Sequence, residues 1–210
     1  MSEAPRYTYL RDGDAIRRAS FAAIAQSPDL ARVAPDLRPI AIRIAHAAGD
    51  TSLLADLVSS PDAVARGRAA LAAGAPVLAD SRMVAAGITA RGARIIETIS
   101  DADVPGLARR LGTTRSAAAV ELWRPHLAGA VCAIGNAPTA LFHLLELVRD
   151  GAPKPALVLG FPVGFIGAAE AKSALAENPF GLAFIALLGR RGGSALAAAA
   201  TNALLAGDSE

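Results

Sequence analysis

The sequence predicts an α/β protein with three layers, in which helices cover both faces of a mainly parallel sheet. Two observations predict this fold class. Five short apolar runs lack the alternation of polar and apolar residues, which is typical of strands that are buried on both faces. Helical segments separate these runs, and such an order produces parallel strands joined by crossover helices. The predicted strands are 75–80, 94–99, 130–134, 156–161 and 183–188.

Three helices are predicted ahead of the first strand. The first, over 12–26, carries small and apolar side chains at helical spacing: Ile16, Ala19, Ser20, Ala23 and Ile24. The second, over 36–49, ends at Gly49, because glycine readily adopts the left-handed conformation that stops a helix.

The third predicted helix covers 60–74, with Ser59 or Ser60 as its N-cap and Gly74 as its stop. Further helices are predicted between and after the strands, at 81–86, 114–123, 138–149, 168–176 and 194–205. We found no linker, low-complexity tail or internal repeat. A chain of 210 residues is long enough for its own core, so we predict a single domain over 1–210.

The composition excludes several classes of protein. A net charge of +2 is too small for a nucleic-acid-binding surface, although the predominance of arginine suits acidic small-molecule ligands. Cys132 is the sole cysteine, which rules out an intrachain disulfide and suggests a buried thiol. The N-terminus lacks a signal-peptide pattern, and no apolar run reaches the ~20 residues of a membrane span. We therefore expect a cytoplasmic protein that binds neither nucleic acid nor membranes.

The residues that follow each predicted strand are the first candidates for a site, because open parallel sheets bind ligands at the carboxyl ends of their strands. On this basis we expect Asp80, Met83 and Asn136 to contact the ligand. Asn136 could equally be a turn residue or a cap. The glycines at 160, 164 and 167 match neither a phosphate-binding P-loop nor a dinucleotide fingerprint.

Arginines beside predicted helix N-termini favour an anionic ligand. Arg190 and Arg191 precede two glycines and a helix that Ser194 would cap. Arg115 lies in the first turn of a helix capped by Thr114, where the helix dipole disfavours a cation by roughly 0.3–1 kcal/mol. Such an unfavourable position suggests that Arg115 and the helix N-terminus share one carboxylate. A solvated basic loop is the competing interpretation for Arg190 and Arg191.

His46 lies in the last turn of the second predicted helix, on the same face as Arg43. Because the C-terminal end of a helix stabilises a cation, His46 is a candidate proton donor. Ser20 interrupts the apolar stripe of the first helix, and it could simply allow close helix packing. His126 and His143 share no metal-ligand spacing with His46. We interpret His143 as a structural residue on an exposed helix face that could pair with Glu146 or with the turn at Leu147. We expect no protein-bound metal and no cofactor.

Several stretches together resemble the precorrin-8X methylmutase family. They run in order from about Tyr7 to Leu204, and the most specific are "IRIAHAAGD", "IGNAPTALFHLLEL" and "LVLGFPVGFIGAAEAK". The others are "YLRDGDAIRRASF", "SPDAVARGRAALAAGAPVLADSRMVAAGI", "TRSAAAVELW" and "GRRGGSALAAAATNAL". The combination of these stretches, rather than any one of them, carries the resemblance.

The resemblance implies a flavodoxin-like three-layer fold, a homodimer and an isomerase of corrin biosynthesis. A methyl group would migrate between adjacent carbons of ring C, giving hydrogenobyrinic acid or its cobalt form. His46 matches the family's catalytic histidine and would protonate the macrocycle, while Ser20 and Arg115 match substrate contacts. Arg43, Arg115, Arg190 and Arg191 suit the acidic rim of such a ligand. The alternatives are a corrinoid carrier without turnover and an unrelated α/β enzyme for phosphate-bearing ligands.

Overall fold

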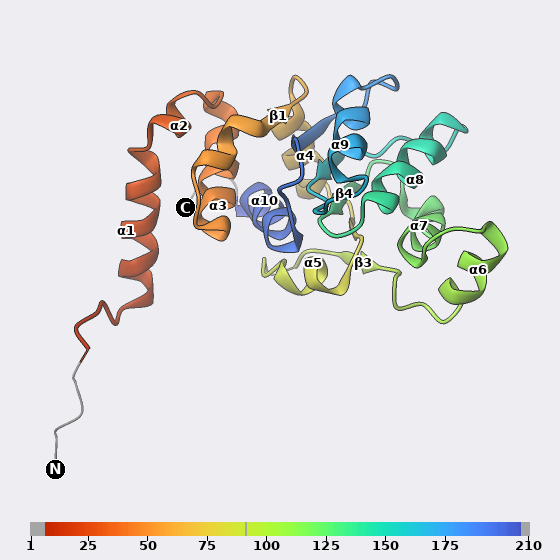
Figure 1. Ribbon diagram of the computed structural model, residues 1–210, viewed down its shortest axis with the longest axis horizontal. Helices are drawn as coiled ribbons and strands as arrows, with labels where there is room; N and C mark the ends of the chain where they lie inside the picture. Colours follow the sequence, from red (N-terminus) through yellow and green to blue (C-terminus); the bar gives the residue numbers. More distant parts are fainter. Residues whose placement is uncertain (1–6, 91, 207–210) are drawn as a thin grey trace, which may run out of the picture.

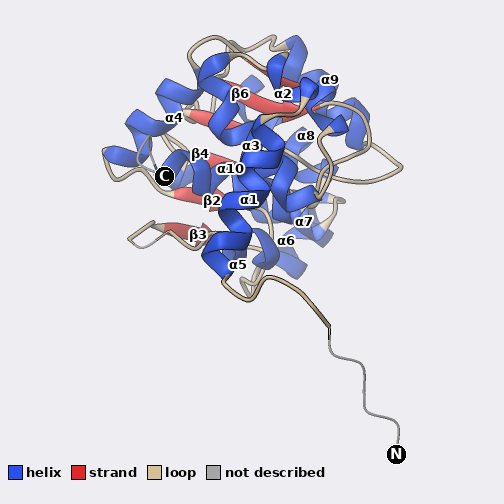
Figure 2. Ribbon diagram, turned by 90° about the vertical axis from the view of Figure 1, so that its left-hand side faces the viewer, coloured by secondary structure: helices blue, strands red, loops and turns tan. Residues whose placement is uncertain are grey.

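A six-stranded sheet with helices on both faces forms the centre of the computed structural model, which describes residues 7–90 and 92–206 (Figures 1 and 2). The strand order is β1-β6-β5-β4-β2-β3, with β1 antiparallel to β6 and parallel pairing elsewhere. The strands are β1 Leu57–Ser59, β2 Val77–Ala79, β3 Ile95–Glu97, β4 Val131–Ile134, β5 Leu157–Gly160 and β6 Phe184–Leu187.

The five parallel strands confirm the predicted fold class and its flavodoxin-like order. Counted along the chain from β2, they lie in the order 2-1-3-4-5, which defines flavodoxin-like sheets. The strand order reverses between β2 and β4. In folds of this kind the ligand crevice lies at that reversal, beyond the carboxyl ends of the strands.

Residues in the strands alternate between two cores, which explains why the apolar runs show no polar positions. In β4, Val131 and Ala133 belong to the core on one face, and Cys132 and Ile134 belong to the core on the other. Cys132 is fully buried, as predicted, and burial raises the pKa of its thiol. Because both faces are covered, every position of a central strand has to be apolar.

Helices divide between the two faces according to these cores. α4 Ala63–Ala72, α5 Arg82–Gly87 and α10 Ser194–Ala206 cover one face. α7 Arg115–Glu121, α8 Pro138–Arg149 and α9 Ala168–Glu177 cover the other, with α6 Val104–Leu111 packed against α7. Pro138 occupies the first turn of α8, as predicted, where its missing N–H leaves no hydrogen bond unmade.

The N-terminal helices form an additional layer outside α10. α3 Arg38–Ala48 packs along α10, and α1 Gly13–Ala25 packs on α3 (Figure 1). The side view confirms that α1, α3 and α10 lie on the same side of the strands (Figure 2). α3 ends at Gly49, which has the left-handed φ of 65° that the sequence predicted. α2 Pro28–Ala31 and the 3-10 helices Pro35–Leu37, Ser52–Asp56 and Arg124–His126 complete the elements.

Several short elements and two caps differ from the sequence predictions. β1, α2, α6 and the 3-10 helices at 52–56 and 124–126 were not predicted. Neither Ser59 nor Ser60 caps α4: the chain is still paired with β6 there, and the Ser60 hydroxyl accepts the Phe184 N–H at 3.0 Å. Ser194 is not an N-cap but the first residue of α10, and the Gly193 carbonyl accepts the first helical N–H groups.

No helix in the described part of the chain combines the length and the apolar character that a membrane span requires. The single domain predicted over 1–210 also includes residues 1–6, 91 and 207–210, which lie outside the described residues.

Candidate active site

His46 and Ser20 meet where α1 packs against the end of α3. The Ser20 Oγ lies 2.8 Å from the His46 Nδ1, although the two residues are 26 positions apart in the chain. Ser20 is half-buried, whereas the His46 imidazole is exposed. The hydrogen bond orients the imidazole and leaves its Nε2 directed away from Ser20, so the ring can exchange a proton with a ligand there.

An aromatic ring and a guanidinium group extend this arrangement. The edge of Phe21 meets the His46 ring at a centroid distance of 5.2 Å and an interplanar angle of 85°. Arg43, one turn before His46 on α3, holds its guanidinium carbon 5.8 Å from the centre of the Phe21 ring. The predicted common face of Arg43 and His46 is therefore observed, and Phe21 is a neighbour that the sequence prediction missed.

A cavity of about 440 Å³ lies beside the imidazole. Residues of α1, the end of α3 and the segment after it line this cavity, among them Ser20, His46, Asp50 and Thr51. A hollow that contains a hydrogen-bonded histidine and a nearby arginine is suited to an acidic ligand that is to be protonated.

The end of α3 lies at the same edge of the sheet as the carboxyl ends of the parallel strands. Arg191, in the loop before α10, donates to the Asp50 carboxylate at 3.1 Å and to the Asp56 carboxylate at 2.8 Å. Because Asp50 follows α3 directly, these contacts fix the His46 turn against that loop. The sequence did not predict the contact between Arg191 and Asp50, because the two residues are 141 positions apart in the chain.

Asp80 and Asn136 occupy the point where the strand order reverses, at the ends of β2 and β4. Asp80 is buried, and its carboxylate accepts the N–H groups of Gly135, Asn136 and Ala137 at 3.0, 2.8 and 3.0 Å. Burial raises the pKa of the Asp80 carboxyl, and the three N–H donors act in the opposite direction. Asn136 itself is exposed at the tip of the turn.

Gly135 shows why this turn needs a glycine. A Cβ at that position would lie 2.7 Å from the Ala197 Cβ and 2.8 Å from the Ser194 Cα. The turn therefore packs directly on the first turn of α10.

The loop after β5 presents apolar side chains beside Arg190. Phe165 and Ile166 are 83% and 89% exposed, and the Arg190 guanidinium carbon lies 5.8 Å from the centre of the Phe165 ring. Met83 is exposed in the first turn of α5. The loop thus presents an exposed apolar surface, in which Phe165 is a neighbour of Arg190 that the prediction did not include.

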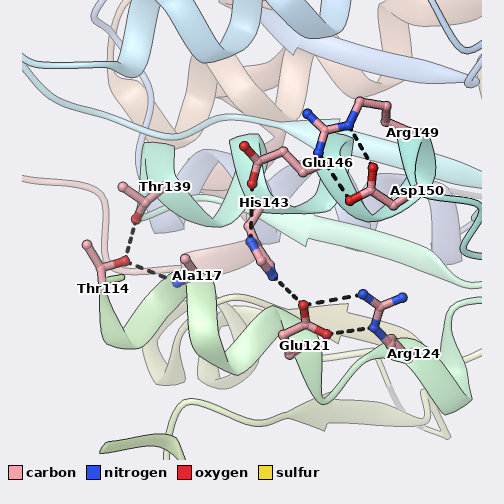
Figure 3. Close-up of polar contacts among 9 residues, drawn as sticks. All are labelled: Thr114, Ala117, Glu121, Arg124, Thr139, His143, Glu146, Arg149 and Asp150. Atoms are coloured by element: carbon pink, nitrogen blue, oxygen red, sulfur yellow. Dashed lines mark hydrogen bonds and ion pairs between the residues drawn. The ribbon is translucent and has the colours of Figure 1, made fainter. Parts of the chain in front are cut away.

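Arg115 lies on the other face of the sheet from α3. Thr114 caps α7 as predicted, because its hydroxyl accepts the Ala117 N–H at 3.1 Å (Figure 3). The exposed Arg115 guanidinium donates to the Ile99 carbonyl at 3.3 Å. Its predicted contact with a ligand carboxylate stays a prediction.

His143 pairs with Glu146 as one of the two predicted partners, but it is half-buried rather than exposed. Its Nε2 lies 3.0 Å from a Glu121 oxygen and its Nδ1 lies 3.4 Å from a Glu146 oxygen, so it joins α7 to α8 (Figure 3). Among the described residues, no three histidine, cysteine, aspartate or glutamate side chains gather closely enough to hold a metal ion.

Comparison with known proteins gives consistent results along the chain. A family model described as precorrin-8X methylmutase matches residues 15–207. The precorrin-8X methylmutase of Pseudomonas aeruginosa is 57% identical over 200 residues, covering 93% of this chain and 96% of its own. That of Sinorhizobium sp is 55% identical over 204 residues, with coverage of 95% and 97%.

A cobalt-precorrin-8 methylmutase from Priestia megaterium is 42% identical over 171 residues, covering 79% of this chain and 75% of its own. Among solved structures, the crystal structure of precorrin-8x methyl mutase from Thermus thermophilus superimposes with a TM-score of 0.82 at 39% identity. It covers 92% of this chain and 95% of its own.

Proposed function

The chain belongs to the precorrin-8X methylmutase family and is an isomerase of cobalamin biosynthesis, and on this premise we propose that His46 is the proton donor of the reaction. The observation that carries this proposal is the 2.8 Å hydrogen bond between Ser20 and His46 beside the cavity. A histidine held in one orientation at the wall of an open hollow is suited to general acid catalysis.

A general acid at this position would accelerate the methyl migration and would be regenerated at the end of each turnover. Protonation of the ring C nitrogen draws electrons toward that nitrogen, and the methyl group migrates with its bonding pair to the neighbouring carbon. The proton then returns to the imidazole, so substrate and product have the same composition. Ser20 keeps the imidazole Nε2 pointed at the ligand throughout, because its hydroxyl occupies Nδ1.

Basic and polar side chains at the same edge would bind the acidic rim of the macrocycle. We assign this role to Arg43, Arg190 and Asn136, with Met83 and the apolar loop after β5 against the flat face. Each sheltered hydrogen bond from arginine to a carboxylate contributes roughly 1.5–3 kcal/mol. Arg115, on the opposite face of the sheet, is proposed to bind an outlying acidic group. An Arg→Ala series that left affinity for hydrogenobyrinic acid unchanged would remove these assignments.

Asp80 and Arg191 were also predicted as substrate contacts, but their polar atoms already have partners within the protein. Asp80 binds the three N–H groups of the Asn136 turn, and Arg191 binds the segment after α3. We propose that Asp80 supports Asn136 from behind rather than touching substrate.

We propose a cobalt-free natural substrate. The relatives named precorrin-8X methylmutase are more similar to this chain than the relative named cobalt-precorrin-8 methylmutase. A cytoplasmic location suits such a biosynthetic enzyme, whose sole cysteine is a buried thiol.

A homodimer is supported by apolar surface that one copy leaves open. The stripe predicted on α1 contains Ile16, which is 45% exposed, and Ile24 is the member of that stripe that is buried. Phe165 and Ile166 add exposed apolar surface at the site edge. A second copy would cover such surface and would shelter the exposed His46 from water.

The test combines a turnover assay with precorrin-8X and a visible-absorption titration with hydrogenobyrinic acid, for wild type and His46→Ala. We expect both proteins to bind the product and wild type alone to convert the substrate. His126→Ala, a histidine in the 3-10 helix after α7, is the matched control and should retain activity. Full turnover by His46→Ala would refute the proton-donor role. Binding without turnover by wild type would instead support a corrinoid carrier.

A further inference from the structure

Arg191 binds the segment 50–56, which follows α3, the helix that carries His46. One guanidinium nitrogen donates to the Asp50 carboxylate at 3.1 Å and to the Ser52 hydroxyl at 2.9 Å. The other donates to the Asp56 carboxylate at 2.8 Å and to the Ser52 carbonyl at 3.3 Å. A single planar group therefore binds both ends of the segment 50–56, and only the fork geometry of arginine can do so.

This segment is continuous with the turn that carries His46. The Asp50 N–H donates to the Ala45 carbonyl at 3.2 Å, and the Gly49 N–H donates to the His46 carbonyl at 3.3 Å. Asp50 also lines the cavity beside the imidazole. A displacement of Asp50 would consequently alter the last turn of α3 and the direction of the imidazole.

Lys172 holds the Arg191 loop from the opposite side. It projects from α9, is fully buried, and donates from Nζ to the Arg191 carbonyl at 2.6 Å. Burial lowers the pKa of its amine to about 8, while the negative charge of Asp56 opposes that shift. A buried charged group contributes little to the net stability of a fold. The main effect of Lys172 is therefore its hydrogen bond to the Arg191 loop.

Gly192 fixes the position of the same loop against β5. A Cβ on Gly192 would lie 2.4 Å from the Phe161 carbonyl oxygen and 2.6 Å from that of Pro162. The Gly193 N–H donates to the Phe161 carbonyl at 2.8 Å. The loop is thus held by the sheet, by α9 and by its own glycines, and Arg191 transmits that fixed position to α3.

We propose that Arg191 is a positioning residue that orients His46 through Asp50, and that Lys172 keeps the Arg191 loop in place. The proposal rests on the proposed role of His46. It replaces the predicted contact between Arg191 and a substrate carboxylate. Two aspartates already surround the guanidinium within 3.1 Å, and their negative charge would repel an acidic ligand.

The first test is Arg191→Lys, which keeps the positive charge but loses the fork. We expect kcat to fall between about tenfold and 100-fold, since a misplacement near 1 Å has an effect of this size. The KM for precorrin-8X and the Kd for hydrogenobyrinic acid should stay within about twofold of wild type. Asp50→Asn, which weakens the same contact from the other side, should show the same pattern and serves if Arg191→Lys does not fold.

The second test is Lys172→Met, which has a similar shape and no charge. We expect the same loss of kcat with a Tm equal to or above that of wild type, because a buried amine is removed. A purely structural role would instead lower Tm and leave the kcat of the folded fraction unchanged. Arg149→Lys, at an exposed ion pair with Asp150 on the end of α8, is the matched control and should leave kcat unchanged.

Other outcomes would overturn the proposal. A raised KM and Kd with unchanged kcat in Arg191→Lys would make Arg191 a substrate contact. Unchanged kinetics in Arg191→Lys and Asp50→Asn would deny any coupling to His46. Both results are distinct from failure of the proposed function, which would show as full turnover by His46→Ala or as no turnover by wild type.

Discussion

At the scale of single residues, the site depends on polar groups that hold backbone rather than ligand. Asp80 is the clearest case, because one buried carboxylate accepts three consecutive N–H groups of the turn that presents Asn136. Removal of an acceptor from buried donors leaves them unsatisfied, which costs more than the hydrogen bond itself contributed.

Asp80→Asn should lower the free energy of unfolding by about 1–3 kcal/mol, because the amide presents its own N–H donors to the donors of the turn. It should also raise the Kd for hydrogenobyrinic acid, since Asn136 loses its support. Urea denaturation and absorption titration measure the two effects. Asp101→Asn is the control: that exposed aspartate accepts the Asp103 N–H, and its loss should have little effect. An unchanged Kd would separate Asp80 from ligand binding.

The sequence predicted some of these residues and not others for a physical reason. Arg43 and His46 share one helix, so their common face follows from periodicity. Ser20 came from the family resemblance, because no local pattern places it against His46. The donors to Asp80 lie 55 to 57 residues away, and Lys172 looks like a surface lysine until α9 is docked on the sheet. Such pairings depend on tertiary packing.

At the scale of elements, α7 and α8 are joined by a polar bridge through Glu121. Its carboxylate accepts from Arg124 at 2.6 and 3.3 Å and lies 3.0 Å from the His143 Nε2 (Figure 3). The hydrogen bond from Arg124 lowers the pKa of Glu121, burial opposes this effect, and His143 lowers the pKa further. The folded protein thus favours the ionised glutamate.

Glu121→Gln should lower the free energy of unfolding by about 1 kcal/mol at pH 7. Because the pKa of Glu121 is lower in the folded state, wild-type stabilisation is complete above the ordinary glutamate range and is lost as pH falls through the lowered value. The difference between the two proteins in urea denaturation should therefore be largest at pH 7 and should shrink as the pH falls below the ordinary glutamate pKa and through the lowered one.

Asp150→Asn provides the comparison for this pH dependence. The Asp150 carboxylate also pairs with an arginine, but this pair is exposed and joins two adjacent residues at the end of α8 (Figure 3). Its loss should therefore have little effect on the free energy of unfolding at neutral or acidic pH. A difference between wild type and Glu121→Gln that stayed constant with pH would contradict the role of the Glu121 charge.

The elements that the sequence predicted are those with a helical period or a continuous apolar run. All five parallel strands were found because buried strands are continuously apolar, and their bounds shifted by at most two residues. β1, Leu57–Ser59, contributes two apolar residues between an aspartate and two serines, so it does not form a continuous apolar run. α6 has a proline and a glycine in its first turn, after Val104. Both residues weaken a helix prediction, although proline is well suited to a first turn.

At the scale of the whole molecule, the extra layer of α1 and α3 determines where the proposed proton donor lies. His46 lies on a helix that α10 separates from the sheet, and yet it is near the carboxyl ends of the strands, because Asp50 after α3 contacts Arg191 before α10. The sequence pattern predicted a sheet covered on both faces, and the family resemblance implied its flavodoxin-like order, but neither indicated this additional layer. The apolar stripe on α1 indicated a core face, whereas one chain buries little of it.

Ile16→Glu should dissociate the proposed homodimer, because it places a charge on the open face of α1. Analytical ultracentrifugation at micromolar concentration should show a dimer for wild type and a monomer for the variant. Leu111→Glu is the matched control: Leu111 on α6 is 46% exposed, against 45% for Ile16, and the variant should stay dimeric. Equal sedimentation of all three proteins would show that α1 lies outside any interface.

The two outer strands of the sheet also affect how the protein behaves when it is concentrated. β1 and β3 have three residues each, and β3 ends in the charged Glu97. Short edges with polar ends present few unpaired N–H and C=O groups to another chain. The sheet is thereby protected against strand-by-strand aggregation, so two copies are more readily joined through side chains than through a continuous sheet.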